Sequence, residues 1–201
     1  MLLYVGLVSW VTGDFSCGVN YILSAVGDYK FSGAANLTDG RVVFAPTNAD
    51  CVGLFDPAGA GSFSCATSTA PAVAVAMDVK FSGAAVLADG RAVFAPSHAD
   101  CVGLFDPGAG TFSCATSTGP ALTMNHKFRG AAVLADGRAV FAPFFADCVG
   151  LFDPAGAGSF SCTASAAPAD TIGAKFWGAA VLADGRAVFA PSHADCVGLF
   201  D

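Results

Sequence analysis

The chain repeats one sequence unit along most of its length. The pattern Lys-Phe-x-Gly opens each copy, at Lys30, Lys80, Lys127 and Lys175, so consecutive copies begin 47 to 50 residues apart. A period in this range is typical of propeller blades, and among helical solenoids only of the longest repeats. Because one copy cannot bury its own hydrophobic face, neighbouring copies must stack to form a core.

Each copy contains four short β-prone runs. In the second copy they begin at Phe81, Arg91, Cys101 and Phe112. Asp-Gly pairs, which favour two-residue hairpins, and a Gly-rich turn opened by Asp-Pro separate the runs. We therefore predict an all-β protein whose four-stranded antiparallel meanders stack around an axis as a β-propeller. A linear β-solenoid is the alternative, but its coils repeat in far fewer residues.

The two ends of the chain are out of phase with the repeat. Copies cover residues 30–79, 80–126, 127–174 and 175–201, the last with three strands only, after an N-terminal part-blade at 4–29. We predict a single domain, 1–201, of about four blades. Two arrangements fit these ends. Residues 15–17 supply the missing fourth strand and close the ring by terminal strand exchange, or the chain forms part of a larger propeller.

Eight cysteines recur in register with the copies. In three copies, a cysteine on the third strand precedes one on the fourth by 13 or 14 residues, and the hairpin can place them opposite each other. The candidate disulfides are Cys51 with Cys65, Cys101 with Cys114, Cys148 with Cys162 and, in a closed ring, Cys17 with Cys196. Buried free thiols are the alternative, and the sequence leaves both this choice and the cellular compartment open.

Composition excludes several kinds of partner. Only 12% of residues are charged, and all 16 acidic residues are Asp, which gives a net charge of −7. This charge repels nucleic acids and anionic membranes, and no apolar run approaches the ~20 residues of a membrane-spanning helix. We therefore expect no nucleic acid and no membrane partner, and a monomer if the ring closes.

The motif in residues 87–107 resembles two kinds of propeller blade. It reads Leu-Ala-Asp-Gly-Arg-Ala-Val-Phe-Ala-Pro, then Ala-Asp-Cys-Val-Gly-Leu-Phe-Asp-Pro after two further residues. Its period and Asp-Gly-Arg hairpin resemble kelch-type blades, although Ala95-Pro96 stands where those blades have Gly-Gly. Its Asp-Gly, its aromatic residue at the end of the second strand and its Val-Gly before Asp-Pro resemble streptogramin-lyase-like blades. That resemblance implies a catalytic His and Glu with a divalent metal, but the chain contains no Glu, so no catalytic residue is carried over.

Differences between the copies gather at one end of the predicted blades, where the loops between second and third strands meet the linkers between blades. Loops on a rigid scaffold commonly carry binding residues. The candidate binding residues are Arg129, Phe144, Phe145, Trp177, His98 and His193. The alternatives are aromatic side chains packed between blades, a solvated Arg and histidines exposed in loops. The Asp at the end of each loop is expected to cap that loop rather than to bind a metal, and these residues are Asp50, Asp100, Asp147 and Asp195.

No nucleophile with a base at interpretable spacing and no phosphate loop appears. We therefore predict a repeat-built scaffold that binds a protein or small ligand on its variable-loop face, with no catalytic residue, metal or cofactor. One alternative is a propeller enzyme of the lyase or hydrolase type that uses loop His and Asp with a divalent metal. The other is carbohydrate binding through Trp177 and the Phe144-Phe145 pair.

Overall fold

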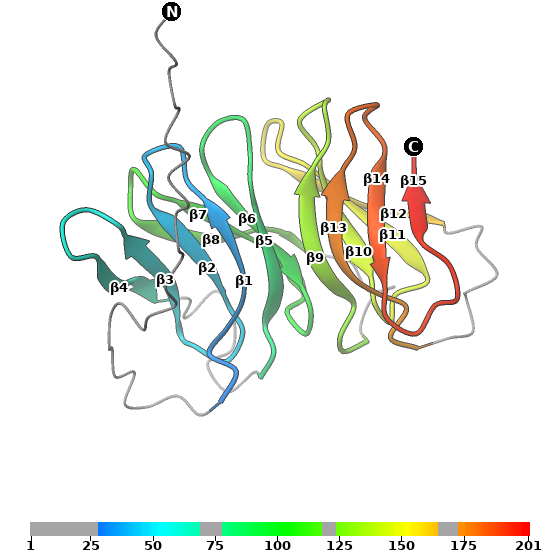
Figure 1. The fold of residues 1–201 in the computed structure, drawn as a ribbon, viewed down its shortest axis with the longest axis horizontal. Coiled ribbons are helices and arrows are strands. Elements are labelled where there is room, and N and C mark those ends of the chain that lie inside the picture. The colour runs from blue at the N-terminus through cyan, green and yellow to red at the C-terminus, as the bar shows by residue number, and fades with distance from the viewer. Residues whose placement is uncertain (1–27, 69–77, 118–123, 165–172) are drawn as a thin grey trace, which may run out of the picture.

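A computed structural model describes residues 28–68, 78–117, 124–164 and 173–201. Within these ranges the chain forms four antiparallel sheets, which we number as blades 1 to 4 (Figure 1). Each sheet follows the chain order, as predicted for a meander. None of the described segments is a helix of the length and apolarity needed to cross a membrane.

The strands of the four blades have the following bounds. Blade 1 contains β1 (Phe31–Asn36), β2 (Val42–Pro46), β3 (Cys51–Asp56) and β4 (Ser62–Ser68). Blade 2 contains β5 (Phe81–Val86), β6 (Ala92–Pro96), β7 (Cys101–Asp106) and β8 (Thr111–Ser117). Blade 3 contains β9 (Phe128–Val133), β10 (Ala139–Pro143), β11 (Cys148–Asp153) and β12 (Ser159–Ala164). Blade 4 contains β13 (Phe176–Val181), β14 (Ala187–Pro191) and β15 (Gly198–Phe200).

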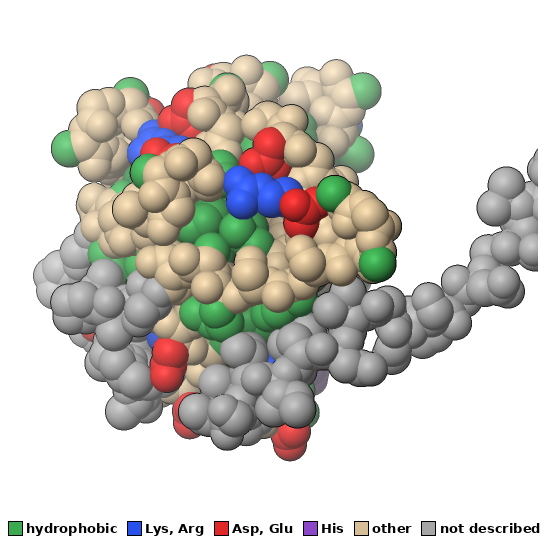
Figure 2. All heavy atoms as spheres, turned by 90° about the vertical axis from the view of Figure 1, so that its left-hand side faces the viewer, with side chains coloured by type: hydrophobic (Ala, Val, Ile, Leu, Met, Phe, Trp, Pro, Cys, Tyr) green, Lys and Arg blue, Asp and Glu red, His purple; other side chains and the backbone are tan. Residues whose placement is uncertain are grey.

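The first hairpin of each blade has a three-residue loop rather than the predicted two-residue turn. In blade 1, Leu37 N–H donates to the Arg41 carbonyl at 2.8 Å, Gly40 N–H donates to the Leu37 carbonyl at 3.1 Å, and Gly40 has φ +89°. The Asp39 carboxylate accepts the Arg41 backbone N–H at 3.0 Å and pairs with its guanidinium at 2.6 Å. These local bonds stabilise the longer loop. Figure 2 shows basic side chains directly beside acidic ones near one end of the molecule.

The innermost strands approach one another through glycines. A Cβ on Gly83 would lie 2.5 Å from the Cα of Gly130, and a Cβ on Gly130 would lie 2.5 Å from the Cα of Gly178. A Cβ on Gly33 would meet the Cα of Gly83 at 2.7 Å. Strands β1, β5, β9 and β13 can therefore lie side by side only because this position carries no side chain.

Three hydrophobic cores lie between consecutive blades, and each joins two different kinds of surface. One blade contributes Leu, Val and Ala side chains, which we call its aliphatic face, and the next contributes mainly Phe and Ala, which we call its aromatic face. Between blades 3 and 4, the aliphatic face consists of Leu134, Val140, Ala142, Val149 and Leu151, and the aromatic face of Phe176, Ala187, Phe189 and Ala194.

The four described sheets form an open arc and not a closed ring (Figure 1). Of the two predicted arrangements, a partial propeller is the one that this shape matches. The strand expected from residues 15–17 lies outside the described residues, as does the part-blade except for its last two residues.

Three of the predicted disulfides are present, which confirms those pairs. Cys51 is joined to Cys65, Cys101 to Cys114 and Cys148 to Cys162, with Cα–Cα distances of 5.4, 5.4 and 5.5 Å. The paired cysteines are not directly opposite, because the ladder places Cys65 across from Gly53 and Cys162 across from Gly150. Cys196 is exposed and forms no disulfide with a described residue, and Cys17 lies outside those residues.

Candidate functional site

The loops between second and third strands and the ends of the linkers lie together at one end of the blades. Thr47 N–H donates to the Lys30 carbonyl within blade 1, and Lys80 N–H donates to the Thr47 carbonyl, both at 3.0 Å. Lys127 N–H makes the same bond to Ser97, and Lys175 N–H to Phe144. The loop of one blade is thus fixed to the start of the next blade, where the copies differ most in sequence.

The residue before each of these lysines has a left-handed backbone. Tyr29, Val79, His126 and Ala174 have φ between 53° and 59° and are the positive-φ residues other than glycine in the described chain. The carbonyl of each accepts an N–H from its blade's second-to-third loop, as when Phe145 donates to His126 at 3.1 Å. A non-glycine residue costs about 1–2 kcal/mol in this conformation, and such strain often accompanies functional sites.

A pocket opens among these residues, beside the innermost strands. It has a volume of about 340 Å³. Its lining consists of Tyr29, Phe31, Ser32, Thr47, Val79, Ser82, Arg129 and Trp177. Four of these occupy the variable position of Lys-Phe-x-Gly, one from each blade, and the Ser32 and Ser82 hydroxyl oxygens lie 3.1 Å apart.

The wall formed by blades 3 and 4 combines a cation with aromatic rings. The Arg129 guanidinium carbon lies 4.2 Å from the Phe144 ring centre and 4.0 Å from that of Trp177, distances at which cation–π attraction operates. Phe144 and Trp177 also contact each other edge to face, with 5.6 Å between ring centres. Arg129 Nε is buried and has no partner, and burial lowers the pKa of this guanidinium. Trp177 remains 55% exposed.

A pair of histidines adjoins Arg129. The rings of His98 and His126 lie 4.2 Å apart, and Arg129 Nη2 lies 3.4 Å from His126 Nδ1. Burial lowers the pKa of both histidines; His126 lowers that of His98 further, and Arg129 that of His126. Both imidazoles are therefore neutral at pH 7. The alternative of histidines exposed in loops does not hold for these two, because both are half-buried: the rings pack on each other, and His126 also contacts Phe144 and Phe145.

The remaining predicted residues divide between the cluster and the open surface. Phe144 is 6% exposed, whereas Phe145 beside it is 39% exposed and lies 4.9 Å from it between ring centres. His193 is exposed, and its Nδ1 lies 3.2 Å from the Ala174 carbonyl oxygen. The structure thus gathers Arg129, Phe144, Phe145, Trp177 and His98 but leaves His193 apart. His126, which the sequence reasoning did not select, joins them.

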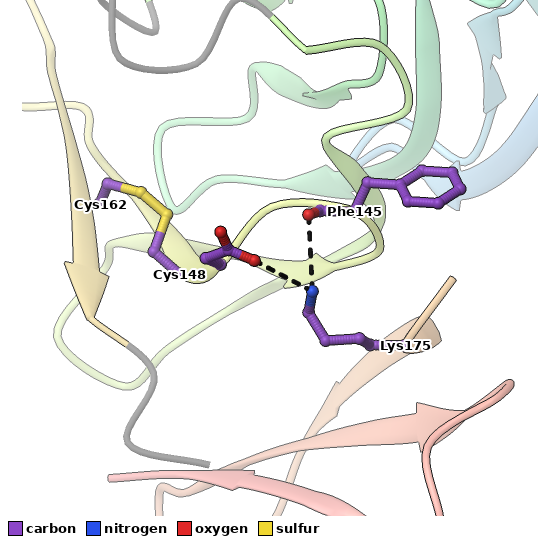
Figure 3. The surroundings of a disulfide bond; sticks show 5 residues. Phe145, Cys148, Cys162 and Lys175 are labelled. Carbon is purple, nitrogen blue, oxygen red and sulfur yellow. Dashed lines mark hydrogen bonds and ion pairs between the residues drawn. A yellow bond between two sulfur atoms is a disulfide. The ribbon is translucent and has the colours of Figure 1, made fainter. Parts of the chain in front are cut away.

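The Asp that follows each loop does not cap it, contrary to the prediction. Asp50, Asp100 and Asp147 pair with Lys80, Lys127 and Lys175 of the following blade at 3.6, 3.5 and 3.4 Å. Lys175 Nζ donates to the Phe145 carbonyl oxygen at 3.5 Å as well as to Asp147, and Figure 3 shows Lys175 and Phe145 near the disulfide of blade 3. The lysines are buried, so their ammonium groups require these acceptors. Within the described ranges, no group of three His, Cys, Asp or Glu is arranged to hold a metal ion.

No protein-family model matches the chain, and no curated protein matches its sequence. Solved structures do resemble it. Virginiamycin B lyase from Staphylococcus aureus aligns with a TM-score of 0.63 and 16% identity over 86% of this chain and 53% of its own. A streptogramin B lyase aligns with a TM-score of 0.56 and 12% identity over 85% of this chain and 54% of its own.

The fold is a β-propeller. A putative gluconolactonase aligns as well, with a TM-score of 0.57 and 12% identity over 84% of this chain and 59% of its own. These likenesses confirm the propeller fold, which the chain shares with streptogramin lyases, whereas the resemblance to kelch blades stays a prediction. The chain spans about half the length of the lyases that it matches.

Proposed function

We propose that this propeller scaffold binds a small ligand in this pocket, one that carries an anionic group next to a flat apolar ring. The observation that supports the proposal is the Arg129 guanidinium, which lines the pocket between Phe144 and Trp177 while its Nε lacks a partner. A volume of about 340 Å³ is in the range of small-molecule sites.

The lining of the pocket suits such a ligand. It contains no Asp, although the chain carries 16, so the positive charge of Arg129 is not neutralised there. The Ser32 and Ser82 hydroxyls can donate to an anion, and the exposed face of Trp177 can stack on an aromatic ring. A guanidinium binds carboxylates through paired N–H donors.

The first prediction concerns binding of indole-3-acetate, followed by isothermal titration with uncharged indole-3-acetamide as the paired probe. We expect the acid to bind and the amide to bind more weakly. We expect Arg129→Gln to weaken binding of the acid about 10- to 150-fold, since a hydrogen bond to a charged group contributes about 1.5–3 kcal/mol.

The matched control is Arg138→Gln, because Arg138 pairs with Asp136 in an exposed turn at the other end of the blade. Equal affinity for acid and amide would contradict the proposal. So would unchanged binding by Arg129→Gln, or absence of binding by either probe at millimolar concentration.

A second candidate function is catalysis, which the neutral His98 and His126 pair favours. A neutral imidazole next to a pocket can act as a general base, and the structural neighbours include a lyase and a putative gluconolactonase. Opening of an aromatic lactone such as dihydrocoumarin, with and without a chelator, would test this function. Catalysis predicts that His98→Asn and His126→Asn each lose turnover, whereas a scaffold shows no turnover to lose.

Carbohydrate recognition by the aromatic residues has less support. Phe144 is buried beneath Arg129 and Trp177, which leaves Trp177 and Phe145 as the exposed rings of this cluster. A glycan array that shows no binding would reject that alternative.

A further inference from the structure

Every contact between consecutive blades repeats the same three features. The aliphatic face of one blade meets the aromatic face of the next, a glycine of one innermost strand meets the glycine of the next, and a loop Asp pairs with the next blade's buried Lys. Two blades of this sequence therefore join in one repeated way, through the aliphatic face of one blade and the aromatic face of the next. Each blade carries both of these faces.

The aliphatic face of blade 4 is uncovered. Leu182, Val197 and Leu199 are 38%, 57% and 57% exposed. The same positions in blade 3 are Leu134, Val149 and Leu151, which blade 4 covers, and they are 9%, 7% and 5% exposed. Blade 4 thus presents the surface that the aromatic face of another blade covers elsewhere in the molecule.

The aromatic face of blade 1 is incompletely covered. Phe31, Phe44 and Phe55 are half-buried, whereas the equivalent Phe81, Phe94 and Phe105 of blade 2 are fully buried against blade 1. The two ends of the arc therefore offer the complementary halves of one interface.

The ion-pair residues and the glycine that join neighbouring blades also lack these partners at the open ends of blades 1 and 4. Asp195 is exposed and Lys30 is half-buried, and neither forms an ion pair with another described residue, although their equivalents in the three interfaces do. A Cβ on Gly178 would meet nothing nearer than the Ala190 side chain at 3.8 Å, so the glycine contact stops there. Lys30 and Gly33 on blade 1 are the partners that the repeating pattern assigns to Asp195 and Gly178.

We propose that two copies of this chain join head to tail at both ends. The aliphatic face of blade 4 in each copy covers the aromatic face of blade 1 in the other, with Asp195 paired to Lys30 across each junction. The result is a ring of eight blades with two-fold symmetry, at the upper end of the usual range of about four to eight. One chain spans about half of a lyase propeller, so two chains supply the blades of one ring. This proposal does not rest on the proposed ligand, although Phe31 belongs both to the aromatic face of blade 1 and to the lining of the pocket. It differs from the monomer expected for a closed ring.

The test is the mass of the 201-residue chain by light scattering and sedimentation over a dilution series. One chain has a mass of 20.0 kDa, so we expect a discrete species of twice that mass. Asp195→Lys and Lys30→Asp should each weaken association at least about tenfold, because like charges then face each other across both junctions. Ser161→Asp, on the exposed outer strand of blade 3, is the control and should leave the mass unchanged.

Mixing the two charge variants gives a decisive result. In a mixed pair, one junction has the natural Asp195–Lys30 contact. At the other junction, the substituted side chains at positions 195 and 30 meet with their charges exchanged. We therefore expect the mixture to recover the double mass. A monomer at every concentration would overturn the proposal, as residues 1–27 or further blades would then be the occupants of these faces. Open-ended polymers, or failure of the mixture to recover, would equally overturn it.

Discussion

At the scale of single residues, the same glycine conformation serves two different purposes. Gly130 and Gly137 have nearly identical φ values, +88° and +89°. A Cβ at position 130 would lie 2.5 Å from the Cα of Gly178, whereas a Cβ at position 137 would meet no atom within 4 Å. Gly137 is therefore needed for backbone conformation alone, and Gly130 also for the approach of two strands.

This difference predicts unequal losses on substitution by alanine. Gly137→Ala should cost about 1–2 kcal/mol in the free energy of unfolding, the usual cost of a left-handed alanine. Gly130→Ala should cost about 1–3 kcal/mol more than Gly137→Ala, because overpacking against backbone forces β9 and β13 apart. Urea unfolding of both variants measures this difference, and equal losses would contradict the close contact.

The candidate site was predictable in part, through the positions at which the copies differ. Arg129 and Trp177 replace the serines of the first two copies, which marked them as candidates. His126 also stands at a varying position, aligned with Tyr29 and Val79, but its left-handed backbone and its contact with His98 depend on packing between blades. Sequence spacing cannot predict such distances between separate repeats.

At the scale of the structural element, a buried lysine connects each blade to the one before it. Lys127 is fully buried, and its ammonium group donates to the carbonyl oxygens of His98 and Met124, both at 3.2 Å. Burial lowers the pKa of Lys127, and the nearby Asp100 carboxylate opposes this shift only in part. The lysine therefore positions the linker at an electrostatic cost.

That cost predicts a pH dependence of stability. Between the lowered pKa of Lys127 in the fold and its ordinary value of 10.5, the unfolded chain binds more protons. The free energy of unfolding therefore rises with pH in that window, and the full cost of burial persists below it. We expect Lys127→Met to remove part of this rise while changing stability at pH 7 by only about 1 kcal/mol. Urea unfolding from pH 7 to pH 10.5 measures the slope, and identical slopes would contradict a buried charge.

The repeating elements were more predictable than their exact connections. Short β-prone runs and turn signals located all four strands in blades 1 to 3, and the spacing of 13 or 14 residues identified three disulfides. The three-residue hairpin was missed because Asp-Gly also suits a three-residue loop in which the Gly takes the left-handed position, as Gly40 does with φ +89°. The lysine partner of Asp100 was missed because the two are distant in sequence and meet only after the blades stack.

At the scale of the whole molecule, stability is shared between neighbours in a line. Each blade packs on the next through one core, as in other repeat proteins. Blades 2 and 3 have a neighbour on both sides, whereas the aliphatic face of blade 4 is open in the single chain. Local opening should therefore begin at that blade.

Amide hydrogen exchange followed by mass spectrometry tests this expectation. In the Asp195→Lys variant, we expect β14 and β15 to exchange at least about tenfold faster than β6 and β7, because fewer buried contacts must break. Adding Lys30→Asp to the same chain should restore protection if a second copy covers blade 4. Uniform protection in the single variant would show that blade 4 is covered by other means.

The sameness of the junctions has a consequence for folding. Because every aliphatic face matches every aromatic face, blade 2 can dock on blade 4 while blade 3 is still unfolded. Nothing in the cores distinguishes that skipped arrangement from the correct one. Repeat proteins are prone to such misassembly. During synthesis from the N-terminus, each blade can dock on the blade before it while later blades have not yet emerged. The order of synthesis would then direct the correct order of the blades.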